Sequence, residues 1–72
     1  MENLSKEEAL SKLASRIKEL RKIKGVSQQD SYNDTGIHFA RIEQGKRDIN
    51  YTTLIKISKY FNLSLSQLFE EF

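Results

Sequence analysis

The chain has 72 residues, a formal net charge of +2, one histidine and no cysteine. A chain this short forms one small domain, so we expect residues 1–72 to be a single domain without disulfides or thiolate metal sites. No apolar run approaches the roughly 20 residues that cross a bilayer, which argues against a membrane protein or a secreted one and favours the cytoplasm.

The charges are distributed unevenly along the chain. Six bases and one acid lie between residues 12 and 24, and Arg41, Lys46 and Arg47 form a second basic group. Acids gather at the two ends, as Glu2, Glu7, Glu8, Glu70 and Glu71. A basic middle with acidic ends is typical of a protein that binds a polyanion, although a solvated helix face gives the same pattern.

The first predicted helix runs from about residue 6 to residue 24. Its apolar positions follow helical spacing and are Leu10, Leu13, Ala14, Ile17 and Leu20. Ser5 and Glu8 form a capping box at its start, and Gly25 is placed to end it in a left-handed conformation.

Two short helices are predicted next. Ser27 caps the second helix, which runs from residue 28 to about residue 32 and ends at Asn33, a residue that tolerates positive φ. Thr35 caps the third helix, and Gly45 ends it.

The C-terminal part predicts two more helices. Asn50 caps the fourth, which ends near Asn62 and has an apolar face formed by Tyr51, Leu54, Ile55, Ile57 and Phe61. Ser64 caps a last turn or two. No strand candidate exceeds a few residues, so the expected fold is all-α, a compact bundle of five helices.

Three motifs occur in a distinctive order. They are Arg-x-x-x-Gly-x-Ser-Gln at residues 21–28, Arg-Ile-Glu-x-Gly-Lys-Arg at 41–47 and Asn-Leu-Ser-Leu-x-x-Leu-Phe at 62–69. In this order they resemble the Cro/repressor-type (XRE) helix-turn-helix family, over nearly the whole chain. The resemblance implies a repressor-like DNA-binding domain whose third helix lies in the major groove of double-stranded DNA.

The chain departs from the family pattern in its helix-turn-helix. About three residues, close to one helical turn, are missing between the Ser-Gln and Ile-Glu pairs. Alignment from Glu43 backwards puts Tyr32 at a core leucine position, Asn33 at the glycine of the turn and Thr35 at the cap of the third helix. We therefore expect a shortened second helix, anchored by a buried Tyr32, and altered docking on DNA.

The resemblance also implies roles for individual residues. The positions that contact bases are Gly36, Ile37, His38 and Arg41, where arginine suits guanine and isoleucine suits a thymine methyl group. The positions that contact the DNA backbone are Gln28, Thr35, Gln44, Lys46 and Arg47, although exposed polar residues of these types are common without any such role. Arg21 and Glu43 occupy positions of a salt bridge that joins the first helix to the third.

Catalysis is not expected. His38 is the only histidine, and Ser27 or Ser31 with Asp34 would be nominal triad partners, but no nucleophile-elbow motif surrounds them. One histidine with scattered carboxylates does not predict a metal site. The sequence therefore predicts no enzyme, cofactor, metal or small-molecule ligand.

The resemblance implies a transcriptional regulator that binds an inverted repeat in DNA as a homodimer. The apolar C-terminal residues Leu65, Leu68, Phe69 and Phe72 are expected at the dimer interface, with closure of the monomer core as the alternative. The alternative function is a protein-interaction module, antitoxin-like or an accessory partner, that keeps the fold without tight DNA binding.

Overall fold

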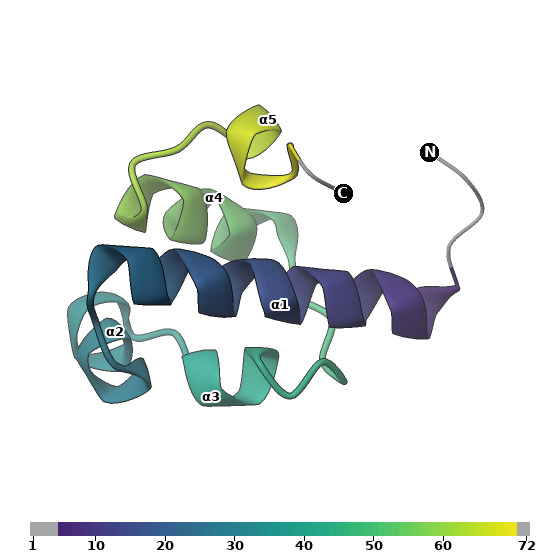
Figure 1. Cartoon of the computed structure of the whole chain (residues 1–72), viewed down its shortest axis with the longest axis horizontal. Helices are drawn as coiled ribbons and strands as arrows, with labels where there is room; N and C mark the ends of the chain where they lie inside the picture. The colour runs from purple at the N-terminus through teal and green to yellow at the C-terminus, as the bar shows by residue number, and fades with distance from the viewer. Residues whose placement is uncertain (1–4, 71–72) are drawn as a thin grey trace.

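A computed structural model describes residues 5–70 of the chain. Five helices follow one another, and residues 5–70 contain no strand, so the all-α prediction is confirmed. The helices are α1 (Lys6–Lys24), α2 (Gln28–Thr35), α3 (Phe39–Ile42), α4 (Tyr51–Tyr60) and α5 (Leu65–Leu68). The helix α1 runs along the long axis, with α2 and α3 on one side and α4 and α5 on the other (Figure 1).

The predicted ends of α1 are confirmed. The Ser5 hydroxyl accepts a hydrogen bond from the Glu8 N–H at 3.1 Å, and the Glu8 carboxylate accepts one from the Ser5 N–H at 3.0 Å. These hydrogen bonds lower the pKa of Glu8, the one from the Ser5 backbone more than the one from its side chain. At the other end, Gly25 has a φ of 80°, a left-handed conformation in which glycine carries no Cβ penalty.

The predicted turn between α2 and α3 is wrong in two respects. The helix α2 continues past Asn33 to Thr35 and ends at Gly36, whose φ is 77°. Thr35 does not cap α3, because its hydroxyl donates to the Ser31 carbonyl at 2.7 Å and accepts from the Ile37 N–H at 3.0 Å. His38 precedes α3 instead, without a capping hydrogen bond from its side chain.

The prediction of a buried Tyr32 is also wrong. Tyr32 is 39% exposed, whereas its neighbour Ser31 is fully buried. The Ser31 hydroxyl donates to the Ser27 carbonyl at 2.9 Å, so the polar atom that α2 turns inward is satisfied within its own helix. A small side chain at this inner position lets α2 pack closely without an aromatic anchor.

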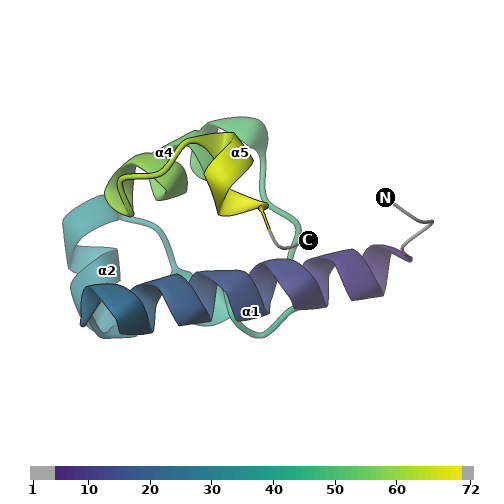
Figure 2. The same cartoon turned by 45° about the horizontal axis from the view of Figure 1, so that its top comes forward.

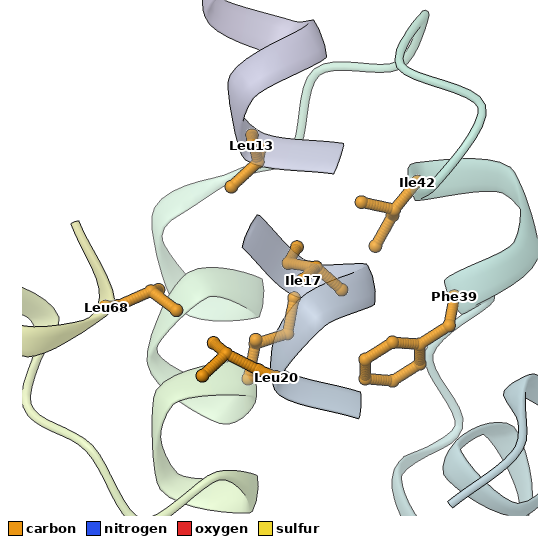
Figure 3. Packing of buried hydrophobic residues seen from close by; sticks show 7 residues of the cluster. Leu13, Ile17, Leu20, Phe39, Ile42 and Leu68 are labelled. Carbon is orange, nitrogen blue, oxygen red and sulfur yellow. The ribbon is translucent and has the colours of Figure 1, made fainter. Parts of the chain in front are cut away.

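The core forms where the two sides of the bundle meet α1. Its buried members are Leu13, Ile17, Leu20, Phe39, Ile42, Ile57 and Leu68. Ile17 and Leu20 of α1 lie between Leu68 on one side and Phe39 and Ile42 on the other (Figure 3). This core fixes α3 against α1 and so determines which side chains of α3 face outward.

The short helix α5 is held against α1 by Arg16. Its guanidinium donates to the carbonyls of Leu68 at 2.8 Å and Gln67 at 2.9 Å, the last two carbonyls of α5. Arg16 therefore has a structural role, although the sequence analysis counted it among the bases that indicate a polyanion partner. Figure 2 shows α5 lying over α1 beside α4.

The C-terminal apolar residues differ from the expected interface. Leu68 has no exposed surface, so its assignment to a dimer interface is wrong. Leu65 and Phe69 are half-buried and pack against the core, and Phe72 lies outside the described residues. Within residues 5–70, none of the helices has the length and apolar character needed to span a membrane.

Candidate nucleic-acid interface

The end of α3 is tied to α1 by Arg21 and Glu43. Arg21 Nε donates to Glu43 Oε2 at 2.8 Å and Nη2 donates to Oε1 at 2.9 Å, which is the bidentate geometry expected for this pair. The two side chains are only 12% and 4% exposed. The hydrogen bonds to Glu43 raise the pKa of Arg21 above its ordinary value.

Two more hydrogen bonds extend this tie to the turn between α1 and α2 and to the first residue of α2. Arg21 Nη1 donates to the Val26 carbonyl at 3.0 Å, and Gln28 Nε2 donates to Glu43 Oε1 at 3.1 Å. The amide of Gln28, which the sequence analysis expected on a DNA phosphate, therefore points to Glu43 in the free protein.

A second tie, which the sequence analysis missed, joins α2 to α4. Tyr60 Oη donates to Asp34 Oδ2 at 2.7 Å and lies 3.5 Å from Ser31 Oγ, while Lys24 Nζ lies 4.9 Å from the centre of the Tyr60 ring. Burial is the main cause that raises the pKa of Tyr60. The contact spans 26 residues, so no local pattern could have indicated it.

Most of the residues expected on DNA meet around one surface hollow of about 290 Å³, which we call the α3–α4 hollow. Its lining includes Thr35, Gly36, Ile37, His38, Arg41 and Arg47. It also includes Lys56 of α4, which the sequence analysis did not assign, and one carboxylate, Asp48. Arg41, Arg47 and Lys56 are exposed, so the hollow offers three cations to an anionic partner.

The expected residues differ in whether they line the hollow and in whether their side chains are exposed there. Gln44 and Lys46 are exposed in the segment after α3 and do not line it. Gly36 belongs to the turn that ends α2, so it does not form part of the start of the third helix as expected. Ile37 is half-buried and packs against the core, which leaves His38 and Arg41 as the exposed side chains of the expected base-reading set.

An adjoining hollow of about 420 Å³, the α2–α3 hollow, shares His38 with the first. It is lined by Gln28, Gln29, Tyr32, His38, Phe39 and Ala40. The rings of Tyr32 and His38 are stacked, with centroids 4.7 Å apart and planes 28° from parallel. Tyr32 thus lies at the surface of the helix-turn-helix, where the sequence analysis had not expected it.

The nominal catalytic partners of His38 are engaged elsewhere. Ser31 Oγ donates to a backbone carbonyl, Ser27 Oγ accepts from the Asp30 N–H at 2.9 Å, and Asp34 accepts from Tyr60. In residues 5–70, no group of three or more histidine and carboxylate side chains is close enough to hold a metal ion.

Comparison with known proteins gives one match. A family model described as a helix-turn-helix domain matches residues 14–71, which is most of the chain. No curated protein and no solved structure matches the chain.

Proposed function

The chain belongs to the helix-turn-helix domain family, of the Cro/repressor (XRE) type, and we propose that it is a sequence-specific transcriptional regulator that binds double-stranded DNA. The family is a DNA-binding one and not a family of enzymes. The observation that carries the proposal is the α3–α4 hollow, where the exposed Arg41 at the end of one short helix lies beside Arg47 and Lys56.

In the proposed complex, α3 enters the major groove and Arg41 reads a guanine through two hydrogen bonds. Lys46, Arg47 and Lys56 neutralise phosphates on either side of the groove, and these contacts position the domain without reading sequence. The Arg21–Glu43 tie holds α3 at its angle, so the reading side chain arrives at a fixed place.

A single copy would read few base pairs. The helix α3 has four residues, about 6 Å of helix at 1.5 Å per residue. We therefore propose that two copies bind the half-sites of an inverted repeat, about one helical turn apart. The half-buried Leu65 and Phe69, with Phe72, are the proposed contacts between the copies, and Phe72→Asp tests them by sedimentation over a range of concentrations.

Selection from a pool of randomised duplexes tests the proposed function. We expect the parent to enrich one sequence and Arg41→Ala to weaken binding to it by about 1 to 3 kcal/mol while losing preference at one base pair per half-site. Lys46→Ala is the matched control, because loss of a phosphate contact weakens all sequences alike. An Arg41→Ala variant with the preferences of the parent would contradict the assigned reader.

A second candidate function, a protein-interaction module, is favoured by one surface on the α1–α4 side. Ile23 is 75% exposed and borders a groove of about 570 Å³ between α1 and the end of α4. Lys24 and Lys59 lie on the same groove. If this function is the main one, Ile23→Glu abolishes the biological effect of the protein in cells. The affinity of this variant for DNA stays the same as that of the parent.

A further inference from the structure

We propose that the α2–α3 hollow seats one phosphate of the DNA backbone together with its deoxyribose, and that Tyr32, held by its stack on His38, is the contacting residue. The inference rests on the proposed function, since it names a further contact of the same DNA-binding face. It assigns a role to a residue that the sequence analysis had expected in the core.

The backbone between α2 and α3 brings the rings of Tyr32 and His38 together. Gly36 turns the chain with a φ of 77°, and His38 then has a φ of −80° and a ψ of 79°, outside the helical region. This path returns the imidazole onto the ring of Tyr32, six residues earlier in the chain. Stacking restricts the rotamers of both side chains, so part of the entropy of ordering Tyr32 is lost before any ligand arrives.

The hydroxyl groups of Tyr32 and Tyr60 differ in what they contact. Tyr60 of α4 donates its hydroxyl to Asp34 of α2 at 2.7 Å. Within residues 5–70 the hydroxyl of Tyr32 makes no such bond, and the residue is 39% exposed. A partly exposed tyrosine whose ring is held by a stack can donate its hydroxyl to a phosphate oxygen, and the apolar surface beside it suits the sugar.

The position and the chemistry of the α2–α3 hollow suit a phosphate with its sugar. In a helix-turn-helix, the first helix crosses the DNA backbone while the second lies in the groove, so a hollow between α2 and α3 faces the strand that borders the groove. Phe39 and Ala40 supply apolar surface for the deoxyribose. None of the six residues that line the hollow is a carboxylate, a lysine or an arginine, so the hollow neither repels a phosphate nor attracts it at long range.

The proposed contact predicts how Tyr32→Phe changes the affinity for DNA and the dependence of that affinity on salt. Because the contact is made by a neutral donor, Tyr32→Phe lowers the affinity without changing its salt dependence. Lys46→Ala, in contrast, reduces the slope of log K against log salt by about 0.9 for each phosphate released. Because the contact is to the backbone, Tyr32→Phe weakens specific and random duplexes by the same factor, unlike Arg41→Ala.

The experiment measures the affinity of the full chain for the duplex enriched by selection, with one phosphate at a time replaced by a neutral methylphosphonate. We expect the replacement to weaken the parent at each phosphate that the lysines and Arg47 contact, and at one further position per half-site by about tenfold, as loss of a hydrogen bond to a charged group should. At that position the replacement has no further effect on Tyr32→Phe. His38→Ala and Tyr32→Phe together cost less than the product of their separate effects, because both remove the same contact.

Ile23→Ala is the control for Tyr32→Phe and His38→Ala, since it removes a well-exposed apolar side chain that lines neither hollow. Its affinity should stay within about twofold of the parent, as for a distant surface change. If the parent prefers the selected duplex and Tyr32→Phe binds it equally well, the inference is wrong and the proposed function stands. If the parent prefers no duplex, both are wrong.

Discussion

Replacing Glu43 by alanine removes the acceptor of three hydrogen bonds, two from Arg21 and one from Gln28. The guanidinium left behind is 12% exposed and keeps only its bond to the Val26 carbonyl. Breaking a buried ion pair by removing one partner costs about 3 to 5 kcal/mol, and we expect about 3 because Arg21 retains some access to water. The variant therefore has a folding defect.

The size of this defect is large for so small a domain. With about 0.05 to 0.15 kcal/mol of stability per residue, the loss is a substantial part of the total. A change of 1 kcal/mol shifts the melting temperature of a domain of this size by about 4 to 8 °C, so we expect Glu43→Ala to melt about 12 to 24 °C below the parent. Circular dichroism during heating measures this shift directly.

Two companion variants make the measurement interpretable. Glu19→Ala breaks a more exposed ion pair, to Arg16, in which the Glu19 side chain is 55% exposed, and should cost less than about 1 kcal/mol. Replacing both partners, as Arg21→Met with Glu43→Leu, should recover stability because no buried charge is left unpaired. A Glu43→Ala variant that melts with the parent but no longer binds DNA would refute the structural role and make Glu43 a DNA contact.

Three other changes probe local features of the fold. Arg16→Met should speed amide hydrogen exchange in α5, because the carbonyls of Gln67 and Leu68 lose the guanidinium that joins them to α1, and unchanged exchange would show that α5 holds without it. Gly36→Ala should cost about 1 to 2 kcal/mol in urea unfolding through its positive φ alone, since no atom lies within 4 Å of the added Cβ. Glu8 has its pKa lowered by the Ser5 N–H, so its contribution to stability is present above its unfolded pKa near 4.5 and is lost as the pH falls through the folded value. Glu8→Gln should therefore flatten the acid limb of the stability curve.

Local signals in the sequence account for most of the helix bounds. Ser5, Ser27, Asn50 and Ser64 each cap a helix as expected, because a cap is a hydrogen bond to a residue three positions away. Such short-range chemistry is visible in a sequence, as is the helical spacing of the α1 core.

The turn before α3 shows where local signals fail. Asn33 and Gly36 both tolerate the left-handed conformation, so sequence alone leaves two places for α2 to end. Contacts with distant residues accompany the later end: Asp34, within α2, accepts from Tyr60, and Ser31 is buried against the rest of the bundle. Because Tyr60 lies 26 residues away, the resulting exposure of Tyr32 could not be predicted.

The sequence also mispredicts which side chains lie at the surface, because contacts between distant residues decide their exposure. Leu68 and Arg16 looked like an interface residue and a basic surface residue, but they meet across 52 positions to close the bundle. Lys56, in contrast, reaches the α3–α4 hollow from a helix that carried no expected DNA contact. In each case the packing of two helices, and no property of either helix alone, determines which side chains are available.

The central claim is that the surface around the α3–α4 hollow reads DNA sequence. One titration tests this claim most directly. Fluorescence anisotropy compares the full chain on its selected duplex and on a random duplex at increasing salt. We predict a preference of about 10³-fold or more for the selected duplex, with affinity falling steeply as salt increases. Equal affinity for the two duplexes, or an affinity independent of salt, would contradict the claim.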